Sequence, residues 1–280
     1  MTTAPAPGRY ALSNAHAGAP GILECLSGVL DANTTELLVD YLAVVDGAMW
    51  QDTSTLLLGA GNGSMALKVA DEISYGTIMV LEVDTSRIRP EVRDRHQVEV
   101  ATCNLLEQPL PAGPWNLVHA PLLFARLPNR RQLLQDVVES LAPGGAVMIE
   151  DWGVAGPGRI LDAPNPRTKY LYQKYQKALI SVSAAANNDL EWSVQTHAAM
   201  RAAGLVDVKT FTRAQSWTGG SPGCQLPIAV SLELEDRLVE HGVTTADLAD
   251  LRHDLADPRT VLLGNLTWST IGRKPLPVQG

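Results

Sequence analysis

Three glycines at every second position, Gly59, Gly61 and Gly63, lie in the segment LLLGAGNGSMALKVA (residues 56–70), between an apolar run and a helical pattern. Glycine lets the chain turn sharply and leaves room where a ligand and a packed helix must come close. The N-terminus of the following helix would offer free N–H groups and the positive end of a dipole. The pattern therefore predicts a ligand held close to the backbone at this turn.

The glycines alone leave the ligand open. A dinucleotide site favours G-x-G-x-x-G, but here the third glycine comes one residue early, and no Gly-Lys-Ser/Thr ending indicates a P-loop. Glu82 and Asp84 end the next apolar run, at about the 20-residue distance where a carboxylate can bind two ribose hydroxyls. We expect Glu82 to bind a ribose, with Asp84 as the second candidate. A solvated acidic strand end is the alternative for both.

Histidines are the candidate general bases, because imidazole titrates near neutral pH. His119 ends a predicted strand, whereas His16 lies in the front segment and His197 in a helical stretch. Each could instead shape a pocket, pack in the core or lie at the surface. Glu150 and Asp151 end another predicted strand and should face the cleft, as a base, a metal ligand or a local hydrogen-bonding group. No metal site is predicted, since H-E-x-x-H and C-x-x-C are absent.

The elements that position these side chains alternate along residues 51–155. Apolar runs typical of buried strands alternate with amphipathic helical segments; we predict strands at 54–60, 76–84, 97–104, 115–121 and 146–152, and helices at 64–73 and 129–141. Such alternation indicates a doubly wound parallel sheet covered on both faces. Ligands bind such sheets at the carboxyl ends of the strands, where the glycine turn lies.

Outside this core the pattern changes. Asn33 and Glu36 resemble a capping box that begins a helix. We predict mostly helix at 165–204, helices at 231–242 and 244–255, and strands at 205–217 and 262–274. The expected parts are an N-terminal helical lid segment (1–50), a cofactor-binding Rossmann-like core (51–155), a helical cap insertion (156–203) and C-terminal strands of the core with a helical insertion (204–280).

Aromatic and polar side chains of the front segment, of the insertion and of the places where the core meets the cap are candidate substrate contacts: Tyr10, Asn14, Trp152, Tyr172 and Trp217. Tyr172 and Tyr175 are three residues apart, so their alternative role is core packing on one helix face. The segment SWTGGSPG (216–223) is rich enough in glycine to act as a hinge or lid loop.

Composition narrows the class of protein. The 280 residues are 45% hydrophobic, enough for a sizeable core, and the net charge of −8 without a basic stretch argues against nucleic acid. No apolar run is long enough to span a bilayer, and the first residues lack the features of a secretion signal. Three widely spaced cysteines indicate reduced thiols, so we expect a cytoplasmic protein. A homodimer is left open.

Residues 54–152 resemble the class I S-adenosylmethionine-dependent methyltransferases. The resemblance rests on LLLGAGNG, VLEVD, CNLLEQPLP and WNLVHAPLLFARLPNRRQLLQDVVESLAPGGAVMIEDW in that order, and the last run is typical of the small-molecule branch. Weaker similarity extends to YALSNAHAG, RAAGLVDVKTFTR, GGSP and IGRKP. The chain therefore looks like a relative of actinobacterial-type small-molecule methyltransferases, which implies roles in secondary metabolism and antibiotic biosynthesis.

The resemblance implies a seven-stranded Rossmann-like sheet with the last strand antiparallel. It also assigns S-adenosyl-L-methionine as cofactor. The implied contacts are Gly59, Ala60, Gly61 and Gly63 beneath the methionine part, Glu82 at the ribose, Asn104 and Leu105 at the adenine, and His119 and Ala120 near the sulfonium.

The sequence departs from the family pattern at three positions. Relatives usually carry an acid two residues before the first glycine, where this chain has Leu57. The adenine-side acid is replaced by Asn104, and Pro121 stands where a longer polar residue is frequent. Leu57 removes a negative charge near the cofactor's cations, which should weaken cofactor binding.

The sequence leaves three functions open. The leading one is metal-independent methyl transfer to a small, partly apolar acceptor by in-line displacement. The second is a cyclase or isomerase on the same fold that transfers no methyl, since fold does not fix function. The third is a non-catalytic, cofactor-binding partner subunit.

Overall fold

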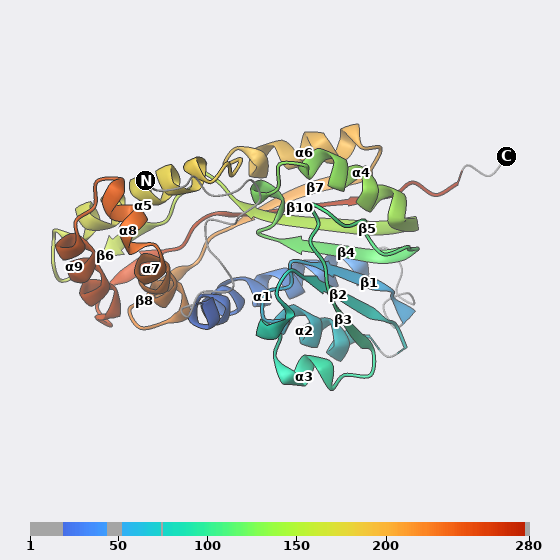
Figure 1. Ribbon diagram of the computed structural model, residues 1–280, viewed down its shortest axis with the longest axis horizontal. Helices are drawn as coiled ribbons and strands as arrows, with labels where there is room; N and C mark the ends of the chain where they lie inside the picture. Colours follow the sequence, from blue (N-terminus) through green and yellow to red (C-terminus); the bar gives the residue numbers. More distant parts are fainter. Residues whose placement is uncertain (1–18, 44–51, 74, 278–280) are drawn as a thin grey trace. The chain divides into compact units, whose positions relative to one another are not determined.

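The chain divides into two compact units. The computed structural model describes residues 19–43, 52–73 and 75–277 (Figure 1). The sheet unit comprises Asp31–Asp151, Trp192–Thr212 and Trp268–Gly280, and the helical unit comprises Met1–Leu30, Trp152–Glu191 and Arg213–Thr267. The domain boundaries predicted from the sequence stay a prediction. Tyr10, Asn14 and His16 lie outside the described residues.

The sheet unit is built on seven strands in the order β3-β2-β1-β4-β5-β10-β7. They are β1 (Thr55–Leu58), β2 (Ile78–Glu82), β3 (Val98–Thr102), β4 (Trp115–Pro121), β5 (Leu141–Trp152), β7 (Val206–Arg213) and β10 (Thr267–Arg273). Strands β1 to β5 pair in parallel. Strand β10 is antiparallel to β5. Lys274, just after the end of β10, exchanges backbone hydrogen bonds with Gly144 and Gly145 near the start of β5. The predicted seven-stranded sheet with an antiparallel last strand is confirmed.

Helices cover both faces of this sheet (Figure 1). The first face carries α2 (Ser64–Glu72), α3 (Pro90–Arg93) and the part of α1 (Ala19–Ala43) from Asp31 onward, since the first part of α1 belongs to the helical unit. The second carries α4 (Arg130–Ser140), α6 (Trp192–Ala202) and the short 3-10 helix η3 (Phe124–Arg126). On the first face, Leu37 and Leu38 of α1 pack on Leu117 and Met148. On the second, Trp192 of α6 stacks on Phe124 with ring centroids 6.2 Å apart.

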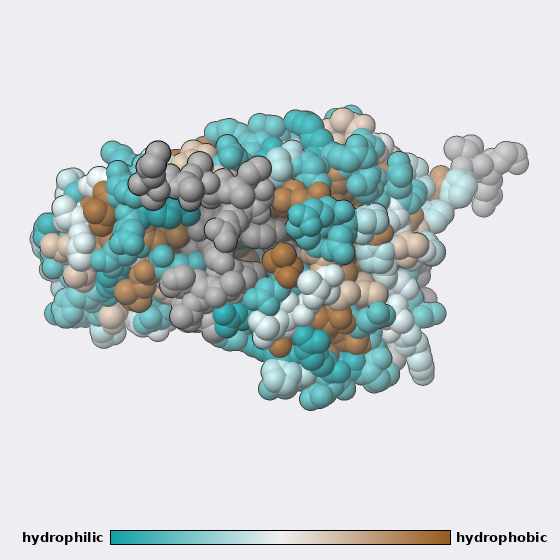
Figure 2. Space-filling model, viewed as in Figure 1, coloured by the Kyte–Doolittle hydropathy of each residue, from teal (hydrophilic) through white to brown (hydrophobic). Residues whose placement is uncertain are grey.

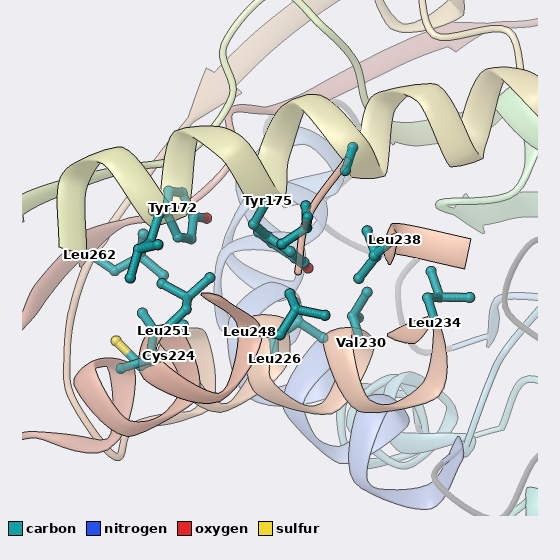
Figure 3. Close-up of a cluster of buried hydrophobic side chains, with 14 of the residues drawn as sticks. Tyr172, Tyr175, Cys224, Leu226, Val230, Leu234, Leu238, Leu248, Leu251 and Leu262 are labelled. Atoms are coloured by element: carbon teal, nitrogen blue, oxygen red, sulfur yellow. The ribbon is translucent and has the colours of Figure 1, made fainter. Parts of the chain in front are cut away.

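The helical unit has its own sheet and core. Strands β6 (Arg159–Asp162), β9 (Val261–Leu263) and β8 (Ser216–Thr218) form a three-stranded antiparallel sheet. The helices are α5 (Thr168–Ala185), α7 (Pro222–Glu233), α8 (Glu235–Glu240) and α9 (Thr245–Ala256). Their apolar faces meet in one cluster, in which Tyr172 and Tyr175 of α5 point toward the leucines of α7 and α9 (Figure 3).

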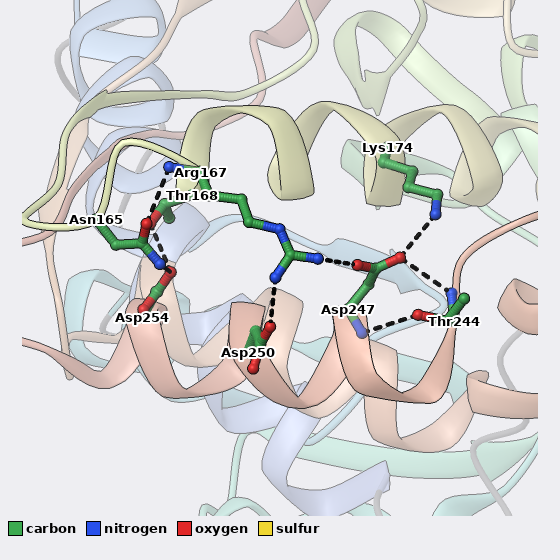
Figure 4. A network of polar contacts seen from close by, with 8 residues as sticks. All are labelled: Asn165, Arg167, Thr168, Lys174, Thr244, Asp247, Asp250 and Asp254. Carbon is green, nitrogen blue, oxygen red and sulfur yellow. Dashed lines mark hydrogen bonds and ion pairs between the residues drawn. The ribbon is translucent and has the colours of Figure 1, made fainter.

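A surface network of charges joins α5 to α9 (Figure 4). Asp247 accepts hydrogen bonds from Arg167 (2.6 Å) and Lys174 (2.7 Å), and it forms a capping box with Thr244 at the start of α9. Arg167 also binds Asp250 at 2.7 Å, with both side chains about half exposed. The network therefore fixes the register of the two helices by contacts at the unit's surface.

Three of the longer predicted elements were wrong in extent. The helical stretch 165–204 is two helices, α5 and α6, which belong to different units. The predicted strand 205–217 is split into β7 and β8, and the predicted strand 262–274 is split into β9 and β10. Strands β7 and β10 belong to the seven-stranded sheet, whereas β8 and β9 belong to the three-stranded sheet. An alternating pattern shows that a segment is extended, but it does not say which strand the segment pairs with.

Local capping and turn predictions were also corrected. Helix α1 begins at Ala19, so Asn33 lies inside it and does not cap it. The side chain of Asn129, at the N-cap position of α4, makes no cap hydrogen bond and donates to the carbonyl of Leu105. The predicted hinge at 216–223 is strand β8, a turn and the start of α7, tied down by a Gly219 N–H bond to the Thr260 carbonyl.

Candidate active site

The glycine turn at the end of β1 has a backbone that favours glycine at all three positions. The φ angles of Gly59, Gly61 and Gly63 are 65°, 62° and 81°, in the left-handed region that other residues rarely adopt. A Cβ on Gly59 would lie 3.3 Å from Leu123, and one on Gly63 would lie 2.9 Å from Val92 of α3. The turn therefore brings backbone, rather than side chains, to the carboxyl end of β1.

Glu82 lies directly against this turn. Its carboxylate accepts a hydrogen bond from the Gly61 N–H at 2.9 Å and another from the Val83 N–H at 2.8 Å. The side chain is buried, and burial raises the pKa of Glu82 although these backbone donors oppose the rise. The strand register explains the position, because the last residue of β2 ends beside the turn that follows β1.

Asp84 has a different local role. Its carboxylate accepts hydrogen bonds from the N–H and the hydroxyl of Ser86, at 3.0 and 2.6 Å, and so caps a short 3-10 helix. These hydrogen bonds lower the pKa of Asp84. Of the two carboxylates considered for a ribose, Glu82 is thus the one that contacts the glycine turn.

Asn104 and Leu105 follow the end of β3, the strand next to β2. The Asn104 side-chain oxygen accepts the Leu106 N–H at 3.1 Å, which orders the loop. Because an amide oxygen has two lone pairs, it can still accept a second hydrogen bond. Leu105 is buried, and its carbonyl accepts from Asn129. An apolar side chain and an amide oxygen thus lie together where the resemblance implies an adenine.

His119 and Glu150 face each other because strand side chains alternate. On β4, Leu117 and His119 point to the face covered by α1; on β5, Met148 and Glu150 do the same. The apolar member of each pair lies under α1, and the polar member follows it at the carboxyl edge. His119 Nε2 lies 2.9 Å from Glu150 Oε2, with both side chains buried.

Glu150 is held by three donors from three elements. Besides His119, it accepts the Thr34 hydroxyl of α1 at 2.7 Å and the Ser269 hydroxyl of β10 at 2.6 Å. Burial alone would raise the pKa of Glu150, but the hydrogen bond and charge of His119, then Ser269 and Thr34, bring it below its ordinary value. When His119 is neutral, an ionised Glu150 favours the tautomer with the proton on Nε2, which leaves the lone pair on Nδ1. Nδ1 is buried and has no hydrogen-bond partner among the described residues.

Asp151 points to the opposite face of the sheet from Glu150. It accepts the Ala125 N–H at 3.3 Å, and burial raises its pKa to about 8. The expectation that both carboxylates face one cleft was therefore wrong, since neighbouring residues of a strand alternate. Within the described ranges no group of three or more histidine, cysteine and acidic side chains is placed to hold a metal ion.

The remaining predicted site residues lie elsewhere. His197 of α6 hydrogen bonds through Nδ1 to the Thr210 hydroxyl of β7 at 2.9 Å. Ala120 follows His119 in β4 and is fully buried. Trp152 donates to Thr267 within the helical unit, and Trp217 packs against that unit's core. Tyr172 is 3% exposed in the same core and its hydroxyl accepts from Gln176, which is the packing role that the sequence left open.

Two polar residues of the Glu150 network, Thr34 and Ser269, were not identified from the sequence. Thr34 precedes Leu38 by four residues, so both lie on one face of α1. A polar extension of an apolar helix face was the available signal. Ser269 had none, because its role depends on the antiparallel direction of β10.

The strand order, the antiparallel strand and the glycine turn beside a buried carboxylate together define the fold of class I methyltransferases. The solved structure of Haemonchus contortus phosphoethanolamine N-methyltransferase 2, in complex with phosphomonomethylethanolamine and S-adenosylhomocysteine, has this fold. It superposes with a TM-score of 0.53 at 15% sequence identity, covering 87% of this chain and 52% of that one.

Sequence comparison finds similar proteins that are named methyltransferases. Methyltransferase str3 of Strobilurus tenacellus is 28% identical over 111 residues, 39% of this chain and 38% of the relative. Methyltransferase str2 of the same organism is 27% identical over 126 residues, 44% of each chain. The matches thus span less than half of these relatives. No protein-family profile matches the chain. The resemblance to class I methyltransferases is confirmed.

The surface adds one further observation. No helix in the described part of the chain is long and apolar enough to cross a membrane. On the face shown in Figure 2, hydrophobic residues lie in separate patches among hydrophilic ones.

Proposed function

We propose that this protein is an S-adenosyl-L-methionine-dependent methyltransferase of a small, partly apolar acceptor. The observation that carries the proposal is the contact between Glu82 and the N–H of Gly61, in a turn of three left-handed glycines. A buried carboxylate beside partly exposed backbone is suited to a ligand that has both hydroxyls and a chain lying along the turn. The curated relatives support the same activity.

The residues around the turn fit the parts of the cofactor. Glu82 accepts the ribose hydroxyls, with Asp84 second because its oxygens already cap a helix. Asn104 and Leu105 border the adenine. The backbone of residues 59–63 supports the methionine part, and His119 and Ala120 lie near the sulfonium. When bound, the cofactor supplies an electrophilic methyl group on a positively charged sulfur.

His119 is the proposed base. Its Nε2 proton is fixed by Glu150, which leaves the Nδ1 lone pair to accept a proton from the acceptor nucleophile. Holding a nucleophile in line with the methyl group supplies several kcal/mol of the barrier, and a base is needed only if the nucleophile carries a proton of high pKa. No metal enters this proposal. His197 is a weaker candidate because Thr210 engages its ring, and His16 stays a prediction.

The acceptor is proposed to be a small molecule of secondary metabolism. Trp152 and Trp217, each partly buried, are the proposed aromatic contacts in the helical unit. Tyr172 is a contact only if substrate reaches the core of that unit. The homodimer, the cytoplasmic location and the roles of Tyr10 and Asn14 also stay predictions.

A non-methylating cyclase or isomerase is the second candidate. Leu57 favours it, because this side chain is 1% exposed in an apolar cluster and offers no charge to a cationic cofactor. Such an enzyme would convert substrate at constant mass and leave bound cofactor unconsumed. A non-catalytic subunit would bind cofactor and turn nothing over.

Calorimetric titration with S-adenosylmethionine, and separately with NAD, tests the proposal. We expect micromolar binding of the first and none of the second. A Gly61→Asp variant should lose the binding, because the new carboxylate fills ligand space and repels Glu82. Candidate acceptors are then screened by mass for the gain of one methyl group. Absence of S-adenosylmethionine binding to the wild-type protein would contradict the assignment.

A further inference from the structure

The cationic end of the proposed cofactor needs an anionic partner. S-adenosylmethionine carries an ammonium and a sulfonium, and a buried charge without a partner is costly. Leu57 is where the related enzymes usually have a carboxylate. Its side chain packs against Met65 and Val69 of α2, and its register partner on β4 is His119. Strand β1 therefore supplies no charge at this end of the turn.

The other carboxylates of the strand ends already accept hydrogen bonds from other groups or point elsewhere. Glu150 is bound by three donors, and Asp151 points to the opposite face of the sheet. Glu82 accepts two backbone N–H groups on the β2 side, where the ribose is proposed. The ammonium would have to find its partner in another layer of the fold.

Asp31 of α1 is a carboxylate of the helix layer, and it reaches the end of the glycine turn. Its carboxylate hydrogen bonds to the side chain of Ser64, the residue that follows Gly63 and begins α2. A carboxylate offers about four lone-pair sites, so the Ser64 bond leaves acceptor capacity. The positively charged side chains of Lys68 and Arg89 act to lower the pKa of Asp31, against the effect of burial.

Neighbouring residues of α1 contact the end of β5 and the start of α2. Thr34 bonds Glu150 at the end of β5, and the Thr35 hydroxyl lies 4.0 Å from the sulfur of Met65, the second residue of α2. Leu57, His119 and Glu150 point to this same face of the sheet. Asp31 thus belongs to the helix layer that covers the face to which Leu57 points. It lies at the end of the sheet where the glycine turn is.

We propose that Asp31 binds the ammonium of the cofactor's amino-acid part, in place of the strand carboxylate that Leu57 lacks. The inference rests on the proposed function. Burial raises the pKa of Asp31 in the unliganded protein, and an ammonium beside it would favour the ionised form. The cofactor's charge is therefore met from α1 rather than from β1.

The test compares ligands with and without that ammonium. Wild type and Asp31→Asn are titrated with S-adenosylhomocysteine, and with 5′-methylthioadenosine, which keeps the nucleoside but lacks the amino-acid part. Asparagine can still accept from Ser64, so the fold should persist, which thermal unfolding checks. We expect about tenfold or more weaker binding of S-adenosylhomocysteine, as for loss of a charged hydrogen bond, and 5′-methylthioadenosine binding within about twofold of wild type.

Two further variants make the readout specific to charge at this position. Asp71→Asn removes the same charge from the exposed side of α2, where Asp71 pairs with Arg95 at 2.7 Å, and should change neither affinity. Asp31→Glu keeps a carboxylate and should lose less affinity than Asp31→Asn.

The outcomes separate this inference from the proposed function. Equal weakening of both ligands by Asp31→Asn, or no weakening of either, would overturn the role of Asp31 while leaving the cofactor site standing. Failure of the wild-type protein to bind either ligand would overturn the proposed function itself.

Discussion

Two carboxylates, Glu150 in the sheet unit and Asp247 in the helical unit, are each held by three side chains in different surroundings. Glu150 is 1% exposed, and its partners come from α1, β4 and β10. Asp247 is 7% exposed, but the side chains of Arg167 and Lys174 that pair with it are 52% and 28% exposed, so solvent reaches this network (Figure 4).

The difference supports the proposal that the Glu150 network serves a site, whereas the Asp247 network stabilises the packing of two helices. Burying an ionised carboxylate costs more than a surface ion pair returns, so a buried one persists only with every lone pair well used. The Glu150 network leaves one polar atom, His119 Nδ1, with no partner in the described chain. An unpaired atom in an otherwise satisfied buried network is where a substrate proton can be accepted.

Removing the buried carboxylate should have the largest effect on stability. Glu150→Ala leaves Thr34, Ser269 and His119 without an acceptor, so we expect a loss of about 3–5 kcal/mol in the free energy of unfolding. Urea denaturation at neutral pH measures it, and Glu150→Gln, which keeps one acceptor, should lose less. A loss as small as that of a surface carboxylate would remove the contrast between the two networks.

Removing the lone pair of His119 should affect turnover rather than folding. In His119→Gln the amide nitrogen can still donate to Glu150, but no base remains. We expect turnover of a methyl acceptor to fall about a hundredfold or more, with little change in the urea midpoint. Unchanged turnover would make His119 a residue that only shapes the pocket.

Asp151 should make stability depend on pH. Its folded pKa is raised to about 8 from an ordinary 3.8, so between these values the folded state holds a proton that the unfolded state has lost. Its contribution to stability is complete below about pH 4 and falls as pH rises toward 8, by about 1.4 kcal/mol per pH unit.

The isosteric variant isolates this effect. Asp151→Asn should remove this dependence of the free energy of unfolding on pH. The free energy of unfolding of the variant should therefore rise relative to that of the wild type between pH 5 and 7. Urea denaturation across that range measures the gain, and parallel pH profiles would show that Asp151 is ionised in the folded state.

The surface network should give the smallest effects. Asp247→Ala removes a helix cap and two ion pairs, so we expect a loss of about 1 kcal/mol in the free energy of unfolding. Asp250→Ala removes only the exposed pair with Arg167 and should cost less than about 0.5 kcal/mol. Comparable losses for Asp250→Ala and Glu150→Ala in urea denaturation would contradict the view that burial separates the networks.

Much of the sheet unit was predictable because its signals are local. The apolar runs that became β1, β2 and β4 are buried strands, and Gly59, Gly61 and Gly63 adopt the left-handed backbone that only glycine takes easily. Glu82 was predicted from its place at the end of the second strand, since adjacent parallel strands end together. Residue type and period were sufficient for these features.

The helical unit was predicted less well, because its elements depend on partners far along the chain. The extended segment at 205–217 serves two sheets, and the helical stretch at 165–204 passes from one unit to the other. Nothing in the period of a single segment encodes such a division, because each part satisfies the same local preference.

The sequence by itself therefore determined the alternating strands and helices, the glycine turn and the carboxylate beside it. Only the tertiary structure decided that Glu150 meets His119, 31 residues away, and Ser269, 119 residues away, while Asp151 turns to the other face. The same holds for Asp31, which reaches Ser64 from a helix that precedes the sheet. Local propensity sets what each segment is, whereas strand register and helix packing set which polar groups share a buried site.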